Sequence, residues 1–344
     1  MARKADSPKL EAVRAMISEF GDIPSLRLAK LARKRHPKLF RSVENARTTI
    51  RYLKGQSGTR LRDNARAAGN SELFTEAGSQ DRCREFIEAI PEPCGTIEPW
   101  KAHPVPGRNV LVISDAHVPY HDRDALSIAI EYGVRRGCDA VLINGDLIDF
   151  HRLSRWEQNP EARSFAGELE DTRKVLKLLR DTFGTVVYSQ GNHEQRYTSF
   201  MRRQAPDFLE ISDFKFEGVM HLEELGIQHI PSYQYARIGM LPIVHGHEFG
   251  KSVFSPVNPA RGYWLRAKTS VLGGHYHRSS AHSEKTLDGT LYGCWSTGCL
   301  CHLSPEYLRV NGWNLGFARV EVIDDSGRYT VDNRKIIGTE TYSA

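Results

Sequence analysis

The chain has 344 residues, of which 40% are hydrophobic and 26% are charged, and its formal net charge is +5. This composition is that of an ordinary soluble protein, and the length favours one large domain with a smaller one. No stretch reaches the length of a membrane span, the first residues lack the apolar core of a signal peptide, and the six cysteines are too scattered for a disulfide scaffold. We therefore expect a cytoplasmic protein with no membrane partner.

Residues 1–66 differ in charge from the rest of the chain. They contain 17 Lys and Arg residues against 6 Asp and Glu residues, a net charge of +11, whereas the remainder has a net charge of −6. A small, strongly cationic segment favours a phosphate backbone as partner, so we expect nucleic acid, DNA in the first place, to bind here.

Apolar residues at helical spacing predict three short helices within residues 1–66. Gly21 is a natural end for the first helix, Pro37 for the second and Gly55 for the third. Three helices with a basic third one are typical of a helix-turn-helix-like module. The alternatives are a helical appendage with a solvated charged face and one that docks on the enzyme or on a partner protein. The residues of the third segment expected to contact nucleic acid are Arg47, Arg51 and Lys54.

Residues 67–106 are predicted to be a linker of mixed stiffness. Loop-like residues come first, and five prolines between positions 91 and 106 interrupt regular structure. Trp100 is the side chain through which we expect this linker to pack along the following domain.

From residue 107 onwards, apolar runs that predict buried strands alternate with segments of helical periodicity. Helices are expected over Asp124–Arg136 and Leu169–Leu179, and irregular structure before His245. Beyond residue 289 the pattern changes to strands, over Leu291–Trp295, 317–323 and 328–336.

Five of the predicted strands end in Asp, Asn or His. The five motifs are Asp115-Ala116-His117, Gly145-Asp146-Leu147-Ile148-Asp149, Gly191-Asn192-His193-Glu194, His245-Gly246-His247 and Gly274-His275-Tyr276-His277. Open α/β folds build their sites at such strand ends. Oxygen and imidazole ligands without thiolate suit divalent ions such as Mn, Fe or Zn, and their number exceeds what one four-coordinate zinc needs. The motifs therefore predict a pair of metal ions.

In this order the five motifs closely resemble the calcineurin-like metallophosphoesterase superfamily, over roughly residues 108–325. The resemblance implies an α/β (α+β) fold, a four-layer α/β/β/α sandwich over residues 107–344, preceded by the small all-helical module. The organisation also resembles phage or prophage metallophosphoesterases with an N-terminal helix-turn-helix-like segment. A bacterial or phage-infected cell is the setting that this implies.

The resemblance also assigns roles to the motif residues. One ion would be held by Asp115, His117, Asp146 and His277. The other would be held by Asp146, Asn192, His245 and His275. Asp146 would then bridge both ions, which suits a carboxylate with two oxygens. Manganese is the expected metal, and iron, zinc or nickel also suit the ligands.

His193 is expected to lie outside the ligand set and, together with Asp115, to be catalytic. It would donate a hydrogen bond or proton to the leaving oxygen, after attack by a metal-bound hydroxide. Asp149 and Glu194 are expected to orient ligands, although Asp149 could instead be a helix N-cap. The residues expected to line the substrate site are His151, Arg196 and His247; for His151 a solvated loop, and for Arg196 a carboxylate partner, are the alternatives.

Cys294, Cys299 and Cys301 are predicted to be small buried residues in a strand and a turn. Their spacing lacks the paired C-x₂-C hooks of a structural zinc site.

The expected reaction is hydrolysis of phosphodiester bonds, in DNA or nucleotides, as by a nuclease. The Asp149 motif does not continue with Arg-Gly as in the superfamily's protein phosphatases. Two alternatives remain, a phosphomonoesterase acting on nucleotides or phosphoproteins, and a DNA-binding regulator in which the phosphoesterase domain is a structural platform.

Overall fold

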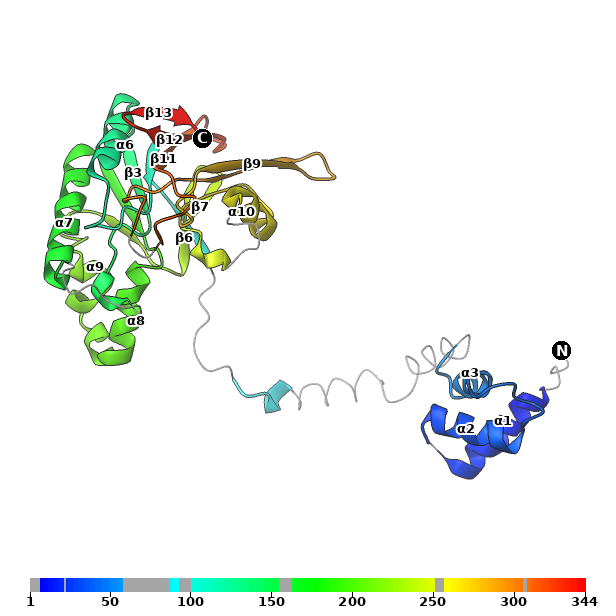
Figure 1. The fold of residues 1–344 in the computed structure, drawn as a ribbon. Coiled ribbons are helices and arrows are strands. Elements are labelled where there is room, and N and C mark those ends of the chain that lie inside the picture. Colours follow the sequence, from blue (N-terminus) through cyan, green and yellow to red (C-terminus); the bar gives the residue numbers. More distant parts are fainter. Residues whose placement is uncertain are drawn as a thin grey trace. The chain divides into compact units, whose positions relative to one another are not determined.

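The computed structural model describes residues 7–21, 23–57, 87–92, 100–154, 163–250, 257–305 and 308–344. The chain divides into two compact units, Met1–Thr96 and Ile97–Ala344, which are described separately (Figure 1). Most of the predicted linker, residues 67–86 and 93–99, lies outside the described residues.

The first unit contains the three predicted helices, α1 (Pro8–Phe20), α2 (Ser25–Arg35) and α3 (Val43–Leu53). Helix α1 ends at Gly21, whose φ of 64° is the left-handed conformation that glycine adopts without a Cβ penalty. Ser42 is the N-cap of helix α3, and its hydroxyl accepts a hydrogen bond from the backbone N–H of Asn45 at 3.1 Å. The helices bury a core of their own, which includes Val13, Leu28, Phe40 and Ile50.

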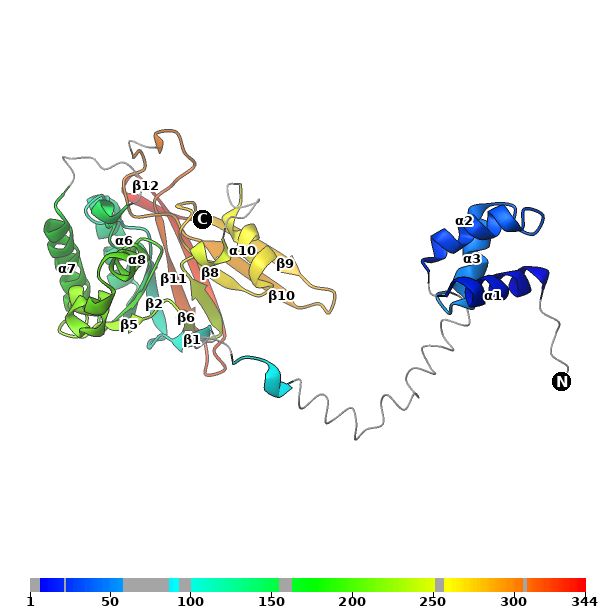
Figure 2. The same cartoon turned by 90° about the horizontal axis from the view of Figure 1, so that it is seen from below.

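The second unit contains two packed sheets (Figure 2). One sheet has the order β13-β12-β11-β2-β3-β4-β5. Its strands are β2 (Asn109–Ile113), β3 (Ala140–Asn144), β4 (Thr185–Ser189), β5 (Gln228–Ile230), β11 (Gly316–Val322), β12 (Tyr329–Ile337) and β13 (Glu340–Ser343). Strands β2 to β5 run parallel, and β11 to β13 extend the sheet in antiparallel fashion. Strands β11 and β12 match the strands predicted over 317–323 and 328–336.

The other sheet has the order β1-β6-β7-β8-β10-β9. Its strands are β1 (Lys101–Pro104), β6 (Gln234–Ile238), β7 (Leu241–Val244), β8 (Val271–Gly273), β9 (Ser280–Lys285) and β10 (Leu291–Ser296). Residues 101–104, assigned to the linker from sequence, thus pair with β6, and the Trp100 ring lies 4.9 Å from that of Tyr235. Strands β5 and β6 lie in a region that the sequence predicted to be irregular. The prediction missed them because short half-buried strands leave little periodicity in the sequence.

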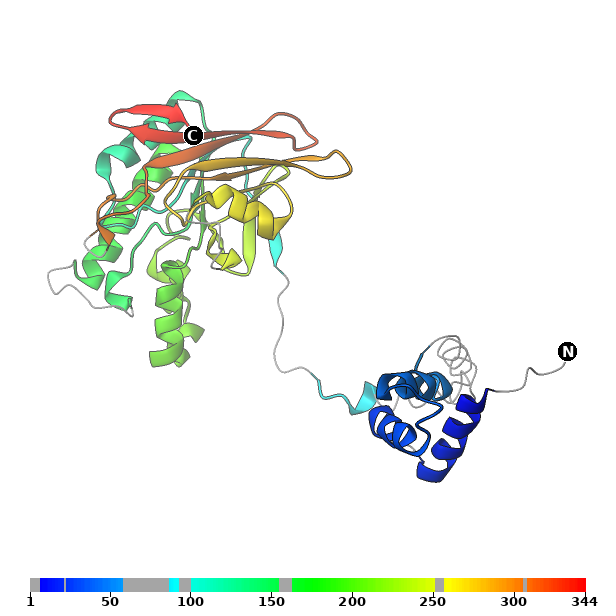
Figure 3. The same cartoon turned by 45° about the vertical axis from the view of Figure 1, so that its right-hand side comes forward.

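Helices cover the outer faces of the two sheets (Figure 3). They are α6 (Arg123–Arg135), α7 (Phe165–Thr182), α8 (Glu194–Gln204), α9 (Phe216–Val219) and α10 (Pro259–Ala267), with short 3₁₀ turns η2 (His151–Leu153), η3 (Pro206–Glu210), η4 (Ser212–Phe214) and η5 (His247–Phe249). Along β2, Val110 and Val112 lie in the core between the sheets, whereas Leu111 and Ile113 lie in the core under the helices. This alternation explains why the strand is apolar on both faces. The predicted four-layer fold is confirmed.

No helix among the described residues is both long and apolar enough to cross a membrane.

Candidate metal centre

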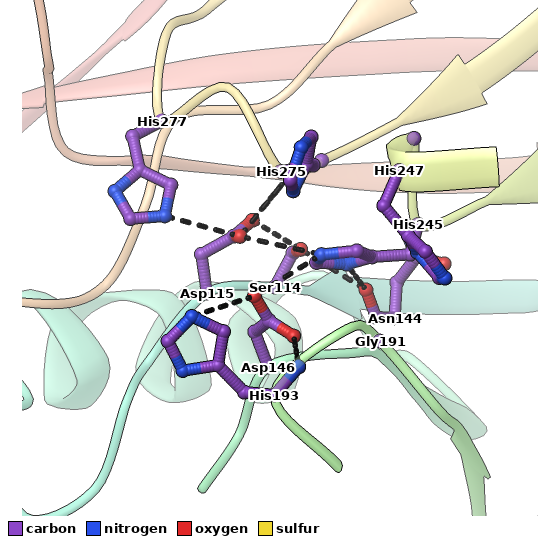
Figure 4. Close-up of polar contacts among 12 residues, drawn as sticks. Ser114, Asp115, Asn144, Asp146, Gly191, His193, His245, His247, His275 and His277 are labelled. Atoms are coloured by element: carbon purple, nitrogen blue, oxygen red, sulfur yellow. Dashed lines mark hydrogen bonds and ion pairs between the residues drawn. The ribbon is translucent and has the colours of Figure 1, made fainter. Parts of the chain in front are cut away.

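The five ligand-bearing motifs follow the carboxyl ends of five strands. Strands β2, β3 and β4 are parallel neighbours in one sheet, and β7 and β8 are parallel neighbours in the other. Packing of the two sheets therefore brings all five strand ends to one place, although the motifs are far apart in the sequence. Figure 4 shows the result, with Asp115 and Asp146 between His277 on one side and His245 on the other.

Backbone strain is concentrated at this place. Among the described residues, eight non-glycine residues have positive φ, and five of these are predicted metal ligands, with φ between 51° and 69°: Asp115, His117, Asp146, His275 and His277. Each such residue costs about 1–2 kcal/mol relative to ordinary backbone conformations. Strain of this kind persists where the surrounding fold imposes it, and it clusters at functional sites.

Asp146 is the centre of the cluster. One of its oxygens lies 3.2 Å from Nε2 of His245 and 3.9 Å from Nε2 of His117. It belongs to two groups whose ligand atoms lie within 4.8 Å of one another, one with Asp115 and His117 and the other with His245 and His275. A carboxylate shared by two groups is the arrangement expected of a ligand that bridges two ions.

Asn192 and His245 each carry a buried polar atom of a type that binds cations. The side-chain oxygen of Asn192 and Nε2 of His245 are buried and have no hydrogen-bond partner among the described residues. The other ring nitrogen of His245, Nδ1, donates a hydrogen bond to the carbonyl of Asn144 at 2.8 Å, which turns Nε2 towards Asp146, 3.2 Å away. Buried polar atoms without partners are rare, and a cation would satisfy both.

The charges of the site also call for cations. Asp115 and Asp146 are almost completely buried. Burial would raise the pKa of each carboxyl, but neighbouring imidazoles, His277 and His245 for Asp115 and His245 and His193 for Asp146, outweigh burial and lower both values. Two buried carboxylates that stay ionised are stabilised only by nearby positive charge.

His277 approaches Asp115 and His117 from the end of a strand in the other sheet. Its Nε2 lies 3.2 Å from an oxygen of Asp115 and 3.2 Å from Nε2 of His117. His275 lies beside the second group, and burial, reinforced by the charge of His245, lowers the pKa of His275 to about 4. His275 is therefore neutral at physiological pH, the form in which imidazole binds metals.

Asp149 holds two imidazoles and is not a helix N-cap. One of its oxygens lies 3.0 Å from Nδ1 of His117 and 2.9 Å from Nδ1 of His193. Burial would raise the pKa of Asp149, but these two hydrogen bonds outweigh it and lower the value. Arg196 contacts the same cluster, since its guanidinium donates to the Asp149 carbonyl and to Nε2 of His193, each at 2.9 Å.

Glu194 holds together, by hydrogen bonds, the loops after β3 and β4 that carry proposed ligands. Its carboxylate accepts hydrogen bonds from the backbone N–H groups of Asp146, Leu147 and Gly191, at 2.7–3.0 Å, and from the Tyr188 hydroxyl at 2.8 Å. These contacts fit the orienting role expected for it. Gly191 is required here because a Cβ would lie 2.3 Å from an oxygen of Asp146.

His247 and His151 border the centre. Nε2 of His247 lies 3.0 Å from the side-chain nitrogen of Gln195, and the His247 ring centre lies 5.3 Å from that of His245. His151 packs against Tyr120 at a ring distance of 5.9 Å, and its Nδ1 lies 3.9 Å from Asp149. The structure thus brings the site residues predicted within residues 107–344 together in one place.

Comparison with known proteins agrees with this geometry. The family model of the calcineurin-like phosphoesterases matches residues 108–279. The Gene 54 protein of Mycobacterium phage D29 is 30% identical over 249 residues, which cover 65% of this chain and 97% of the phage protein. The chain belongs to the calcineurin-like phosphoesterase family. The Gene 54 protein of Mycobacterium phage L5 is 28% identical to this phosphoesterase, over 66% of the chain and 98% of the relative.

Two solved structures are similar to this phosphoesterase at low identity. Vacuolar Protein Sorting 29 from Cryptosporidium parvum is 15% identical, with a TM-score of 0.39, over 69% of this chain and 96% of that one. The phosphoesterase Yfce from E. coli is 14% identical, with a TM-score of 0.32, over 65% of this chain and 97% of that one.

Residues beyond the motifs also contact the centre of this metallophosphoesterase. The Cys301 sulfur lies 3.8 Å from Nδ1 of His277 and groups with His117 and His277. The Trp313 ring lies 4.2 Å from the His277 ring. Buried Glu168 accepts a hydrogen bond from the N–H of His151 at 3.3 Å. No sequence motif marks Trp313 or Glu168; Cys299-Leu300-Cys301-His302 was the one visible signal for Cys301.

Proposed function

We propose that this metallophosphoesterase hydrolyses phosphodiesters, in DNA or in nucleotides. The proposal rests on the residue that follows the Asp149 motif, which is the uncharged Phe150 where the superfamily's protein phosphatases have Arg. Phe150 is completely buried there and stacks against Phe165 and Tyr197, so this position gives the substrate phosphate no cation. A phosphodiester carries one negative charge and a monoester up to two, so a site with fewer cationic side chains favours the diester.

The carboxylate, amide and imidazole side chains of this centre are of the types that bind two divalent ions. Asp115, His117, Asp146 and His277 would hold one, and Asp146, Asn192, His245 and His275 the other. When bound, such ions supply Lewis-acid stabilisation of the phosphoryl oxygens and lower the pKa of water.

His193 is the proposed proton donor to the leaving oxygen. Its Nδ1 is engaged by Asp149, which leaves Nε2 as the atom that carries the transferable proton. Burial would lower the pKa of His193, but Asp146 and Asp149 outweigh it and raise the value, which favours the protonated, acidic form. A protonated Nε2 cannot accept the hydrogen bond of Arg196, so this contact must open when His193 takes up its proton.

The basic first unit supports nucleic acid as the source of the diester. Its excess of 11 positive charges within residues 1–66 favours a polyanionic partner.

The test compares bis-p-nitrophenyl phosphate with p-nitrophenyl phosphate, in the presence of Mn, Ni or Zn. We expect metal-dependent hydrolysis, with the diester cleaved faster than the monoester. His193→Ala should lower kcat about 10²–10⁴-fold and keep its metal content, measured by elemental analysis. His221→Ala is the matched control, because this exposed imidazole pairs with Glu224 at 2.9 Å, away from the centre.

Each contrary result has a definite meaning. Faster monoester cleavage would favour the phosphomonoesterase alternative. Absence of cleavage of either ester by the metal-loaded protein would favour the structural-platform alternative. Loss of metal in His193→Ala would place His193 among the ligands and would overturn its assigned role.

A further inference from the structure

Helix α2 and the connector after it form a strongly cationic segment. Residues 23–41 contain seven Lys and Arg residues and no Asp or Glu: Arg27, Lys30, Arg33, Lys34, Arg35, Lys38 and Arg41. By contrast, α3 carries Glu44 among its cations. The positive charge of the first unit is therefore concentrated on α2, not on the third helix.

Three of these side chains form one exposed row, which we call the basic stripe: Arg27, Lys30 and Lys34. Their spacing of three and four residues places them on one face of α2. All three are exposed, whereas Leu28, Ala29 and Ala32 are completely buried in the helical core. The stripe is about 10 Å long, from the rise of 1.5 Å per residue.

The acidic groups described next to α2 pair with cations outside the basic stripe. Glu19 pairs with Arg35 at 2.6 Å, and Glu44 lies 3.4 Å from Arg47. Arg33 donates to the Pro37 carbonyl at 2.8 Å and so serves the turn after the helix. Within the described part of the first unit, the basic stripe has no acidic partner, so its charge is available to a ligand.

Two of the three cations in and just after the third helix already have partners within the first unit. Nζ of Lys54 donates to the Ile23 carbonyl at 2.6 Å, and Arg47 is half-buried beside Glu44. Of the residues expected to contact nucleic acid, Arg51 remains exposed. It lies at the end of α3 that adjoins the start of α2, where the Ser25 hydroxyl meets the Gln56 side chain at 2.9 Å.

We propose that the basic stripe of α2 is the surface through which this protein binds the phosphate backbone of DNA. The proposal rests on the DNA partner proposed above and is independent of the hydrolytic centre. Over 10 Å, duplex DNA presents about six phosphates, enough to face three cations. The stripe offers Arg and Lys side chains, which are common donors to phosphate oxygens, and contacts to the backbone carry no sequence information.

The experiment measures binding of the full-length chain to a fluorescent DNA duplex at several salt concentrations. The stripe variant is Arg27→Gln, Lys30→Gln, Lys34→Gln. The third-helix variant is Arg47→Gln, Arg51→Gln. The charge-matched control is Arg123→Gln, Arg135→Gln, Lys285→Gln, which removes three exposed cations from the second unit. Circular dichroism verifies that α2 remains helical, as expected for substitutions on its exposed face.

The stripe variant should bind at least about tenfold more weakly, and its slope of log affinity against log salt should fall by about three. The control should bind like the unaltered chain, and a duplex of different sequence should give the same result. An equal loss in stripe and control variants, or a loss confined to the third-helix variant, would overturn the proposal. Absence of DNA binding by the unaltered chain would also overturn it, while hydrolysis of the small diester would still stand.

Discussion

Single residues at the centre are held by partners on other elements, and this is what makes the ligand geometry specific. Asp149 lies between His117 and His193, and the Asn144 carbonyl fixes the ring of His245. Partners of this kind choose the ring nitrogen that faces the metal and raise the basicity of the ligand. His277 has an unusual partner, because the group beside its Nδ1 is the sulfur of Cys301 rather than a carboxylate.

Cys301→Ala should therefore weaken metal binding. Removing the partner of a metal-binding imidazole typically costs about 10–100-fold in affinity, and we expect about tenfold here because a thiol is a weak hydrogen-bonding group. Competition with a fluorescent chelator measures the affinity for Mn and Zn. Cys294→Ala is the control, since Cys294 is equally buried but contacts the Thr269 carbonyl in another core cluster. Equal effects of the two substitutions would show that Cys301 acts through packing alone.

At the scale of an element, α7 supports the turn that carries Asp149. Glu168 on α7 accepts a hydrogen bond from His151, while its other oxygen has no partner among the described residues. Burial, together with the charge of Asp149, raises the pKa of Glu168 to about 7. Because the folded-state pKa lies above the ordinary value of 4.5, the folded protein binds this proton more tightly than the unfolded chain.

This linkage predicts the pH dependence of stability. As pH rises from about 4.5 to about 7, Glu168 should lower the stability of the metal-free protein, and above pH 7 the loss is complete, at about 3 kcal/mol. Glu168→Gln should therefore be more stable than the unaltered protein at pH 8 and equally stable below pH 4.5, as measured by urea unfolding. Glu170→Gln on the same helix is the control, because Glu170 is exposed and pairs with Lys174. A stability gain that does not change with pH would contradict the assigned titration.

At the scale of the whole molecule, the chain has separate hydrophobic cores in its two units. The core of α1–α3 draws on residues 13–53, whereas the cores of the sheets and their helices draw on residues 105–336. All the proposed metal ligands belong to the second unit. Metal binding should therefore stabilise that unit without acting on the helical one.

Calorimetry of the full chain should show this selectivity. Saturation at about 100 times the dissociation constant stabilises the second unit by about 2.7 kcal/mol, so removal of metal with a chelator should lower its melting temperature by several degrees. The transition of α1–α3 should not move. A chelator that shifts both transitions equally would show that the units unfold together.

The sequence by itself was sufficient for the strands that carry the five motifs and, through the resemblance of those motifs to a known family, for the four-layer fold. Proposed ligands such as Asp115 and Asn192 lie two or three residues beyond the end of a short apolar strand, so local pattern and motif order indicate them without knowledge of packing. The three N-terminal helices were predictable for the same reason, because their apolar spacing and end signals are local. The sequence did not predict strand β1, because Lys101–Pro104 has no strand pattern of its own and is a strand only through its pairing with β6.

Only the tertiary structure decided which side chains meet. Asp115 and His277 are 162 positions apart and come within 3.2 Å because two sheets pack face to face. The same packing brings Cys301 to His277, and the fold of α7 brings Glu168 to the Asp149 turn. In the helical unit, the basic stripe of α2 is exposed to solvent, whereas Lys54 is partly buried and donates a hydrogen bond to the Ile23 carbonyl. Local sequence carries the chemical identity of each group, but distance, burial and charge pairing arise from contacts between remote segments.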